Sequence, residues 1–386
     1  MQPPHLSLYV HFPYCVRKCP YCDFASRASR QIPEQVYLTA LGRELSLWRQ
    51  ELATDARPLH SIFLGGGTPS LFSPASIATL LGWIGEHWSL EEGCEITIEA
   101  NPESLTLDKL AGYHQAGVNR LSLGVQSLLD ERLKQLHRPH DVATAIRAMA
   151  WGRQAGFTNI NLDLIYATPG QSLSDWQGEL AMAIALQPDH LSCYTLTLEE
   201  GTPFFAAHEQ GELPVLGEEE ELLLFSHTRQ WLTQQGMPPY EISNFCRPGF
   251  QCRHNLNYWN YGDYLGLGAA AHGKWTSQQG IIHRTVNIHH DQPYMASLMA
   301  GTGGRQSKEI LTPREAGAET LIMGLRLHQG IHLAHYQRHA GISLWQAHGK
   351  TLEELLQDGL LQLAKEQLSL TENGVKLANL VLAKLV

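Results

Sequence analysis

Short apolar runs and longer amphipathic runs alternate along the first 200 residues of the chain. The apolar runs are typical of buried strands, and between them apolar residues recur with the period of a helix. This alternation favours parallel strands joined by right-handed helical crossovers. It predicts an α/β fold with six β/α units in a partial, TIM-like (β/α)6 barrel. The predicted strands are Leu6–Phe12, Ser61–Leu64, Glu95–Ala100, Arg120–Val125, Asn159–Tyr166 and His190–Leu198, and the helices include Glu34–Leu52, Ala75–Trp88, Leu107–Gly117, Val142–Gly156 and Ser174–Leu186.

The repeat stops after Glu200, and the remaining sequence divides at a glycine-rich segment, Gly301–Gly304. Helical periodicity returns from Thr312, and Leu360–Leu370 has the pattern of a short hairpin. Helices with one small hairpin indicate a small C-terminal, winged-helix-like domain. We therefore predict three parts: the barrel at 1–200, a barrel extension at 201–304 and the helical domain at 305–386.

Composition narrows the class of protein and the compartment. The chain has 386 residues with 43% hydrophobic and 17% charged, which is enough to fill a large core. A net charge of −10 argues against a nucleic-acid partner. There is no apolar run of the roughly 18 residues that a membrane span needs, and the N-terminus lacks the pattern of a signal peptide. Seven cysteines, an odd number with three clustered, favour a reducing compartment, and we expect a cytoplasmic protein.

Three cysteines with the spacing C-x3-C-x2-C follow the first predicted strand: Cys15, Cys19 and Cys22. Thiolates are the soft ligands that iron–sulfur clusters use. A cubane [4Fe–4S] cluster has four irons, so three cysteines leave one iron open to another ligand. A zinc site or unrelated buried thiols are the alternatives. Zinc loops usually supply two Cys or His pairs, and no second C-x2-C occurs in the chain.

Glycine and polar residues follow the predicted strands, where parallel barrels place their chemistry. The second strand leads into Gly65–Pro69, whose glycines let backbone groups face a ligand. Glu99 ends the third strand and offers acceptors for ribose hydroxyls. Taken singly, these are equally typical of a tight turn or a cap. The segment Gly266-x-Gly268-x-x-Ala271 imitates a dinucleotide fingerprint, but it lacks the surrounding βαβ unit, so we reject that reading.

Together the motifs resemble the radical S-adenosylmethionine (SAM) superfamily. Nearly end to end, the chain resembles the oxygen-independent coproporphyrinogen III dehydrogenases and their relatives, the HemW-type haem chaperones. The resemblance rests on Tyr9–Pro13 with the three cysteines, Gly65–Pro69, Glu99–Pro102, Gly124–Ser127, Asn161–Tyr166 and His254–Trp259.

The resemblance implies a radical-SAM barrel with two cofactors. The three cysteines would hold a [4Fe–4S] cluster, and SAM would bind its open iron through amino and carboxylate groups. The glycine loop resembles the one that holds the methionine amino group in the superfamily. The implied SAM contacts are Tyr9, Tyr21, Gly66, Gly67, Thr68, Glu99, Gln126, Arg138 and Asp163, with Thr197 as a weaker match.

Two departures from the dehydrogenase pattern favour a haem chaperone. The dehydrogenases carry a fourth cysteine, C-x3-C-x2-C-x-C, where this chain has Phe24. They also carry a longer segment before the cluster loop, whereas fourteen residues precede Cys15 here. We therefore expect haem binding and delivery to a haem-requiring acceptor, such as a membrane-bound respiratory protein, without coproporphyrinogen III dehydrogenase activity. That dehydrogenase is the alternative, and a radical-SAM enzyme acting on another substrate is a third.

The segment His254-Asn255-x-x-Tyr258-Trp259 also matches the chaperone pattern. Imidazole is a common ligand of haem iron, and a porphyrin needs apolar and aromatic surroundings. We predict His254 as the axial ligand, facing an opening at the barrel rim, with Tyr258 and Trp259 as an aromatic wall. His272 and Cys252 are the alternative ligands.

Overall fold

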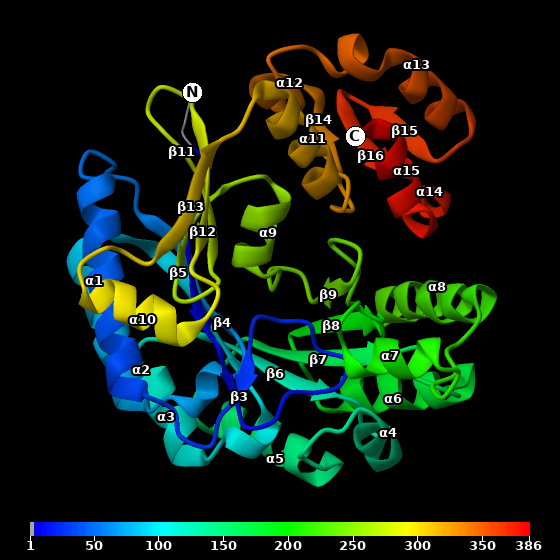
Figure 1. The fold of residues 1–386 in the computed structure, drawn as a ribbon. Coiled ribbons are helices and arrows are strands. Elements are labelled where there is room, and N and C mark those ends of the chain that lie inside the picture. The colour runs from blue at the N-terminus through cyan, green and yellow to red at the C-terminus, as the bar shows by residue number, and fades with distance from the viewer. Residues whose placement is uncertain (1–3) are drawn as a thin grey trace.

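An eleven-stranded sheet is the centre of the fold in the computed structural model, which describes residues 4–386. Six adjacent strands of this sheet are parallel and appear in chain order, as the sequence pattern predicts. They curve into an open barrel (Figure 1). These strands are β1 (Leu6–Phe12), β4 (Leu59–Gly66), β5 (Leu90–Ala100), β6 (Arg120–Gln126), β7 (Ile160–Tyr166) and β8 (His190–Thr195).

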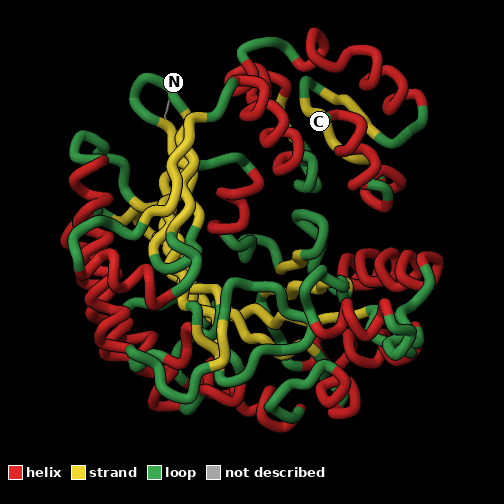
Figure 2. Tube along the Cα trace, viewed as in Figure 1, coloured by secondary structure: helices red, strands yellow, loops and turns green. Residues whose placement is uncertain are grey.

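Helices cover the outer face of the barrel and connect its strands (Figure 2). Local capping sets several helix starts: the Ser73 side chain accepts from the Ser76 N–H, and Ser172 forms a capping box with Asp175. One short helix in the β6–β7 connection, α4 (Asp130–Gln135), was not predicted. The predicted crossover helices are α1 (Glu34–Glu51), α2 (Pro74–His87), α3 (Leu107–Gln115), α5 (Val142–Gln154) and α6 (Leu173–Ala185).

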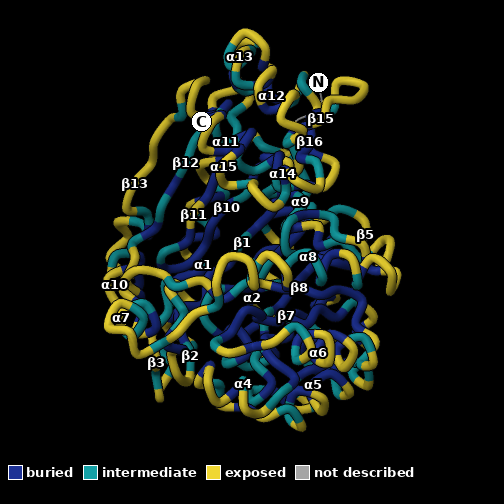
Figure 3. The backbone as a smooth tube through the Cα atoms, turned by 90° about the vertical axis from the view of Figure 1, so that its right-hand side faces the viewer, coloured by how far each residue is buried: buried dark blue, intermediate teal, exposed yellow. Residues whose placement is uncertain are grey.

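The parallel strands are buried on both faces, which Figure 3 shows as a dark interior beneath exposed loops. Apolar side chains from the strands and the helices form one large core on the outer side of the sheet. Several buried strand positions are polar instead. Ser61 of β4 donates to Ser7 of β1 over 2.8 Å, and Asn161 of β7 lies 2.6 Å from the ring of His190 of β8. The barrel interior therefore contains a polar, hydrogen-bonded layer.

The sheet continues at both edges beyond the six predicted units. Strand β9 (Asn244–Cys246) pairs antiparallel with β8 and overlaps the last two residues of Tyr240–Phe245, a segment whose sequence predicts an extra strand. Strand β10 (Asp263–Leu267) runs parallel to β1 and is followed by three antiparallel strands that the sequence analysis missed. The remaining elements of this part are β11 (His272–Thr276), β12 (Ile282–Asn287), β13 (Arg305–Ile310), α7 (Pro203–Glu209), α8 (Glu218–Gln234), α9 (Arg253–Trp259) and α10 (Asp291–Met299).

The C-terminal part has its own apolar core and a small three-stranded sheet, which fits the predicted winged-helix-like domain. The predicted boundary at residue 304 needs correction, because β13 pairs with β12 of the main sheet. Among the described helices, none has the length and apolar character to cross a bilayer. The elements are α11 (Pro313–Gly324), β14 (Ile331–His332), α12 (Leu333–Ala340), α13 (Leu344–Gln357), β15 (Leu361–Ala364), β16 (Gln367–Leu370), α14 (Glu372–Lys376) and α15 (Ala378–Leu385).

Candidate functional site

The cysteine loop, residues 13–29, leaves the C-terminal end of β1 and is fastened at both ends. Its two short strands, β2 (Tyr14–Cys15) and β3 (Arg27–Ala28), pair with each other. The Tyr14 hydroxyl donates to Asp291 over 2.7 Å, and Arg27 forms an ion pair with the same carboxylate at 2.8 Å. The glycine loop adds backbone bonds, from Gly67 N–H to the Phe12 carbonyl (2.7 Å) and from Thr68 N–H to the Tyr14 carbonyl (2.8 Å). The loop therefore has a defined position above the strand ends.

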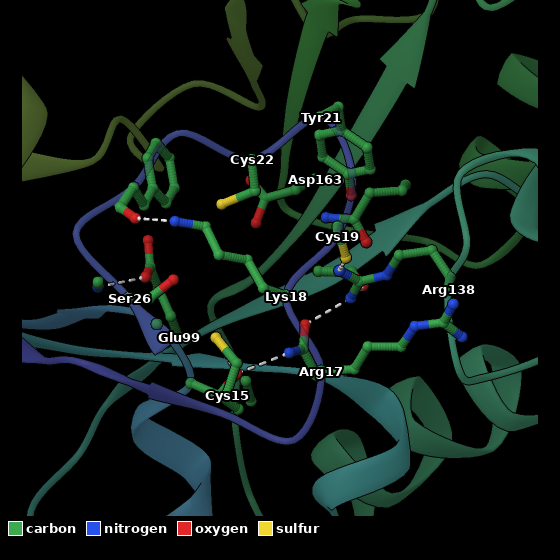
Figure 4. Close-up of a pocket in the computed structure, with 18 of the residues that line it drawn as sticks. Cys15, Arg17, Lys18, Cys19, Tyr21, Cys22, Ser26, Glu99, Arg138 and Asp163 are labelled. Atoms are coloured by element: carbon green, nitrogen blue, oxygen red, sulfur yellow. Dashed lines mark hydrogen bonds between the residues drawn. The ribbon is translucent and has the colours of Figure 1, made fainter. Parts of the chain in front are cut away.

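The three loop cysteines line one cavity, and Figure 4 shows their sulfur atoms arranged around its middle. Thr68 Oγ1 lies 3.5 Å from Cys15 Sγ, and Arg138 Nη1 lies 3.4 Å from Cys19 Sγ. Burial raises the pKa of the Cys15 and Cys22 thiols, so both are protonated without metal at neutral pH. A soft metal replaces such protons when it binds. Hydrogen bonds at two sulfurs suit thiolates that carry negative charge.

The same cavity collects most of the residues predicted to contact SAM. Tyr9 and Thr197 do not line it. The Tyr9 hydroxyl lies 2.9 Å from His11 Nδ1, and Thr197 is exposed beyond the end of β8. Sequence reasoning missed Asn101 and Ser122 as site residues, although Asn101 lies in a quoted motif. The predicted residues in the lining are Tyr21, Gly66, Gly67, Thr68, Glu99, Gln126, Arg138 and Asp163.

The glycine loop at the end of β4 requires glycine for two different reasons. Gly66 has φ of +110°, in the region that side chains disfavour. A Cβ on Gly67 would lie 2.6 Å from the Tyr14 carbonyl oxygen and 2.8 Å from that of Phe12. The backbone of this loop therefore approaches the cysteine loop more closely than any other residue allows. The Gly66 N–H donates to Glu99 Oε2 over 3.0 Å.

Two carboxyl groups face the cavity: Glu99 near the end of β5 and Asp163 in the middle of β7. Burial first, and the nearby Asp163 charge second, raise the pKa of Glu99 to about 8. Burial also raises the pKa of Asp163, which accepts hydrogen bonds from Ser122 (3.1 Å) and Asn161 (2.8 Å). A cationic ligand in this cavity would favour ionisation of both groups. SAM carries a sulfonium and an ammonium group, so the pair fits it.

Buried polar atoms without partners also point to a ligand. Arg138 donates to Asn101 Oδ1 over 2.5 Å and to the Gly124 carbonyl over 3.0 Å. Across residues 4–386, however, its Nε and the Oε1 of Gln126 are buried and have no hydrogen-bond partner. Gln126 has φ of +65°, an uncommon value for a residue with a side chain. Both residues line the cavity, and a polar ligand there would satisfy both atoms.

The predicted haem ligand, His254, occupies a different place from the one expected. Its side chain is 1% exposed, packed against Phe63 beneath α9. Its Nδ1 lies 2.9 Å from Ser61 Oγ and its Nε2 2.9 Å from the Tyr258 hydroxyl. The prediction that it faces an opening at the barrel rim is wrong, because α9 packs against β4 and buries the ring. Burial lowers the pKa of His254 to about 3, so it is neutral.

The other residues named for haem differ in their accessibility. Tyr258 and Trp259 are half-buried. The alternative ligand Cys252 is fully buried, with its Sγ 3.4 Å from Glu95 Oε1. His272 is exposed at the start of β11. The rejected dinucleotide fingerprint falls on β10 and the turn to β11, so its glycines precede a strand and not a helix.

Comparisons with known proteins give two family matches, one over the barrel and one near the C-terminus. Residues 9–183 match the radical SAM superfamily, which implies a [4Fe–4S] cluster and SAM, and residues 311–377 match the HemN C-terminal domain. The structure superposes on that of coproporphyrinogen III oxidase (HemN) from Escherichia coli with a TM-score of 0.82. The match covers 99% of this chain and 90% of that one at 24% identity, which shows a common fold.

Two curated relatives place the chain more closely. It is 44% identical to the heme chaperone HemW of Haemophilus influenzae over 297 residues, which is 76% of each chain. It is 34% identical to the heme chaperone HemW of Buchnera aphidicola over 385 residues, which is 98% of each chain. With identities above 30% that extend from the cysteine loop to the C-terminal domain, the chain belongs to the HemW family of the radical SAM superfamily.

Proposed function

We propose that this protein is a haem chaperone that binds haem and delivers it to haem-requiring acceptor proteins, and that it carries a [4Fe–4S] cluster and SAM. The observation that carries the cofactor part is the cavity in which three loop cysteines meet a glycine loop, two carboxyl groups and unpartnered polar atoms. The kinship with proteins named heme chaperones supports the haem part. The odd number of cysteines, three of them clustered in one loop, is the ground for proposing a reducing, cytoplasmic setting.

Each part of the cavity has a role toward these cofactors. Cys15, Cys19 and Cys22 would ligate three irons and leave the fourth for the amino and carboxylate groups of SAM. Backbone groups of the glycine loop would hold the methionine end, and Glu99 the ribose hydroxyls. Arg138 would orient Cys19 by a hydrogen bond, and its positive charge would stabilise the Cys19 thiolate. When bound, this pair of cofactors supplies one-electron chemistry at the open iron.

The alternative function, coproporphyrinogen III dehydrogenase, shares the fold. Phe24 argues against the dehydrogenase, because it occupies the position of that family's fourth cysteine. The Phe24 side chain is 60% exposed beside the cavity. The test is an anaerobic assay of reconstituted protein with coproporphyrinogen III, SAM and a reductant. We expect no protoporphyrinogen IX. Product at ordinary enzyme rates, or rescue of a strain that lacks the dehydrogenase, would establish the alternative.

Haem ligation by His254 requires α9 to move. The helix has seven residues, and the His254 ring nitrogen that binds iron would have to give up its hydrogen bond to Ser61 or Tyr258 first. Of the three candidate ligands, His272 is accessible without such a movement. We keep His254 as the proposed ligand because it lies in the motif that matches the chaperones, and we infer that haem binds an opened form.

A haem titration followed by Soret absorbance tests the ligand and the opening together. We expect saturable binding in the wild type, loss of the characteristic band in His254→Ala, and faster amide exchange over residues 250–262 with haem present. An unchanged Soret band in His254→Ala, together with its loss in His272→Ala, would identify His272 of β11 as the haem ligand. Absence of saturable binding in the wild type would remove the chaperone proposal.

A further inference from the structure

Two histidines and one glutamate gather at the end of the sheet opposite the cysteine loop, where β1 begins near the N-terminus (Figure 1). His5 immediately precedes β1, His60 is the second residue of β4, and Glu91 is the second residue of β5. His5 Nδ1 lies 3.1 Å from Glu91 Oε1, and His60 Nδ1 lies 2.7 Å from Glu91 Oε2. Their ligand atoms all lie within 4.8 Å of one another. We call these residues the His5–His60–Glu91 cluster.

The sheet is irregular at this row of residues. Between β1 and β4 the register passes from Leu6↔Leu59 to Ser7↔Ser61, so His60 is an inserted residue without a partner in β1. Between β4 and β5 it passes from Leu59↔Leu90 to Ser61↔Glu95, which leaves Glu91 within a second insertion. Such bulges re-aim side chains that a regular strand would direct elsewhere. Two adjacent bulges turn His60 and Glu91 toward the same point beside His5.

The two imidazole rings are arranged to share one partner. They stack with their centroids 4.2 Å apart and an interplanar angle of 29°, and both present Nδ1 to the carboxylate. His60 and Glu91 are partly buried, with 19% and 26% of their side chains exposed, whereas His5 is 63% exposed. An ion could therefore enter past His5 and meet ligands that the sheet already positions.

We propose that the His5–His60–Glu91 cluster is a binding site for a divalent cation of the Zn²⁺ class, with water completing the coordination. Neutral imidazole and carboxylate are zinc ligands, and they favour Zn²⁺, Ni²⁺ or Cu²⁺ over Mg²⁺ or Ca²⁺. Two ligands of a tetrahedral zinc ion lie about 3.4 Å apart. The two histidine–carboxylate separations, 3.1 and 2.7 Å, lie near that value, and all three ligand atoms lie within 4.8 Å of one another. Coordination through Nδ1 leaves the ring proton on Nε2 of each histidine.

Bound metal would link residues at the starts of three neighbouring strands, β1, β4 and β5. That link would hold the start of β1 against β4 and β5, at the end of the barrel away from the SAM cavity. The site is independent of the proposed haem function, because none of its residues lines the cavity at the cysteine loop.

The test uses protein already loaded with its iron–sulfur cluster, so that the loop cysteines cannot take up the added metal. Zn²⁺ is titrated calorimetrically into the wild type, His60→Gln, Glu91→Gln and His332→Gln. The last is a matched control, because His332 forms an exposed pair with Glu366 at 3.6 Å that offers only two ligands. We expect one Zn²⁺ per chain in the wild type and the control, and affinity at least about tenfold weaker in the other two variants.

X-ray absorption at the zinc edge gives a second readout that does not depend on these variants. We expect nitrogen and oxygen ligands only, together with a Zn²⁺-dependent rise in the thermal midpoint of the wild type that is absent in His60→Gln. Sulfur ligands would assign the ion to a cysteine and overturn the proposal. Equal affinity in the wild type and His60→Gln, or no binding by the wild type, would overturn it as well.

Discussion

Replacing Glu99 with glutamine tests whether this carboxyl group, near the end of β5, is protonated when SAM is absent. Burial, and then the charge of Asp163, raise the pKa of Glu99 to about 8 from an ordinary 4.5. Glutamine has the shape of protonated glutamate, and its amide oxygen can still accept the Gly66 N–H that now lies 3.0 Å from Glu99. The substitution therefore removes the ionisation of this group and changes little else.

The sign and the size of the effect follow from the linkage between protonation and folding. Because the pKa is raised in the folded state, the proton stabilises the fold at low pH, and this contribution is lost as pH rises through about 8. The pKa of Glu99 shifts from 4.5 to about 8 on folding. At about 1.4 kcal/mol per pKa unit, the loss of folding stability at high pH approaches roughly 5 kcal/mol. About 2 kcal/mol of it is already lost near pH 6, where the unfolded carboxyl is ionised. The stability advantage of Glu99→Gln should therefore grow by about 2–3 kcal/mol between pH 6 and 8.5.

The assay is urea unfolding of SAM-free protein at both pH values, followed by tryptophan fluorescence. Glu34→Gln is the matched control. Burial alone would raise the pKa of Glu34, but hydrogen bonds from Ser73 and Ser76 lower it below its ordinary value. Its contribution to stability is present above the ordinary pKa and is lost only as pH falls through the lowered one. The difference between this variant and the wild type should therefore stay constant from pH 6 to 8.5.

The result that would refute the reasoning is a pH-independent difference between Glu99→Gln and the wild type. It would mean that Glu99 is ionised in the empty site throughout this range. The cavity would then be an anionic site before any ligand enters, and the argument from burial would be wrong.

Three further predictions concern the cofactors. Replacing the three loop cysteines with alanine should abolish iron and acid-labile sulfide after reconstitution, whereas Cys246→Ala should retain both; a full cluster in the triple variant would contradict the assignment. Gly67→Ala should lower cluster content, because its Cβ would meet two backbone carbonyls, whereas Gly82→Ala has nothing within 4 Å and should match the wild type. SAM binding, measured calorimetrically at pH 7 in two buffers of different ionisation enthalpy, should release a proton from the wild type and none from Glu99→Gln; equal release in both would assign the proton to another group.

Local patterns in the chain were sufficient to predict the six parallel strands and the spacing of the cysteine loop. Each β/α unit has its own apolar period and its own turn residues, so its boundaries depend on neighbours in the sequence. The spacing of Cys15, Cys19 and Cys22 likewise describes one short loop. Because parallel strands place their C-terminal ends on one edge, Glu99, Asp163 and the glycine loop were expected at the same rim. The cavity confirms that gathering.

Local sequence patterns did not predict the contacts between segments that are distant in the chain. Arg138 was expected near SAM, but its position between Cys19 and Asn101 depends on how the loop after β6 folds over the barrel. The strands β10–β13 are short and carry mixed patterns, and they form because β1 offers a free edge for pairing. The hydrophobic pattern within residues 263–310 does not indicate that β1 has a free edge for pairing.

Only the tertiary structure decided the environment of His254 and of the His5–His60–Glu91 cluster. A sequence pattern can show that a residue is in a buried element, but it does not say whether the side chain enters the barrel interior or reaches solvent. For His254 the answer came from the packing of α9 against β4, which buries both ring nitrogens in hydrogen bonds. For the cluster it came from two register shifts, because a bulge changes the direction of a side chain without leaving a signal in hydrophobic periodicity.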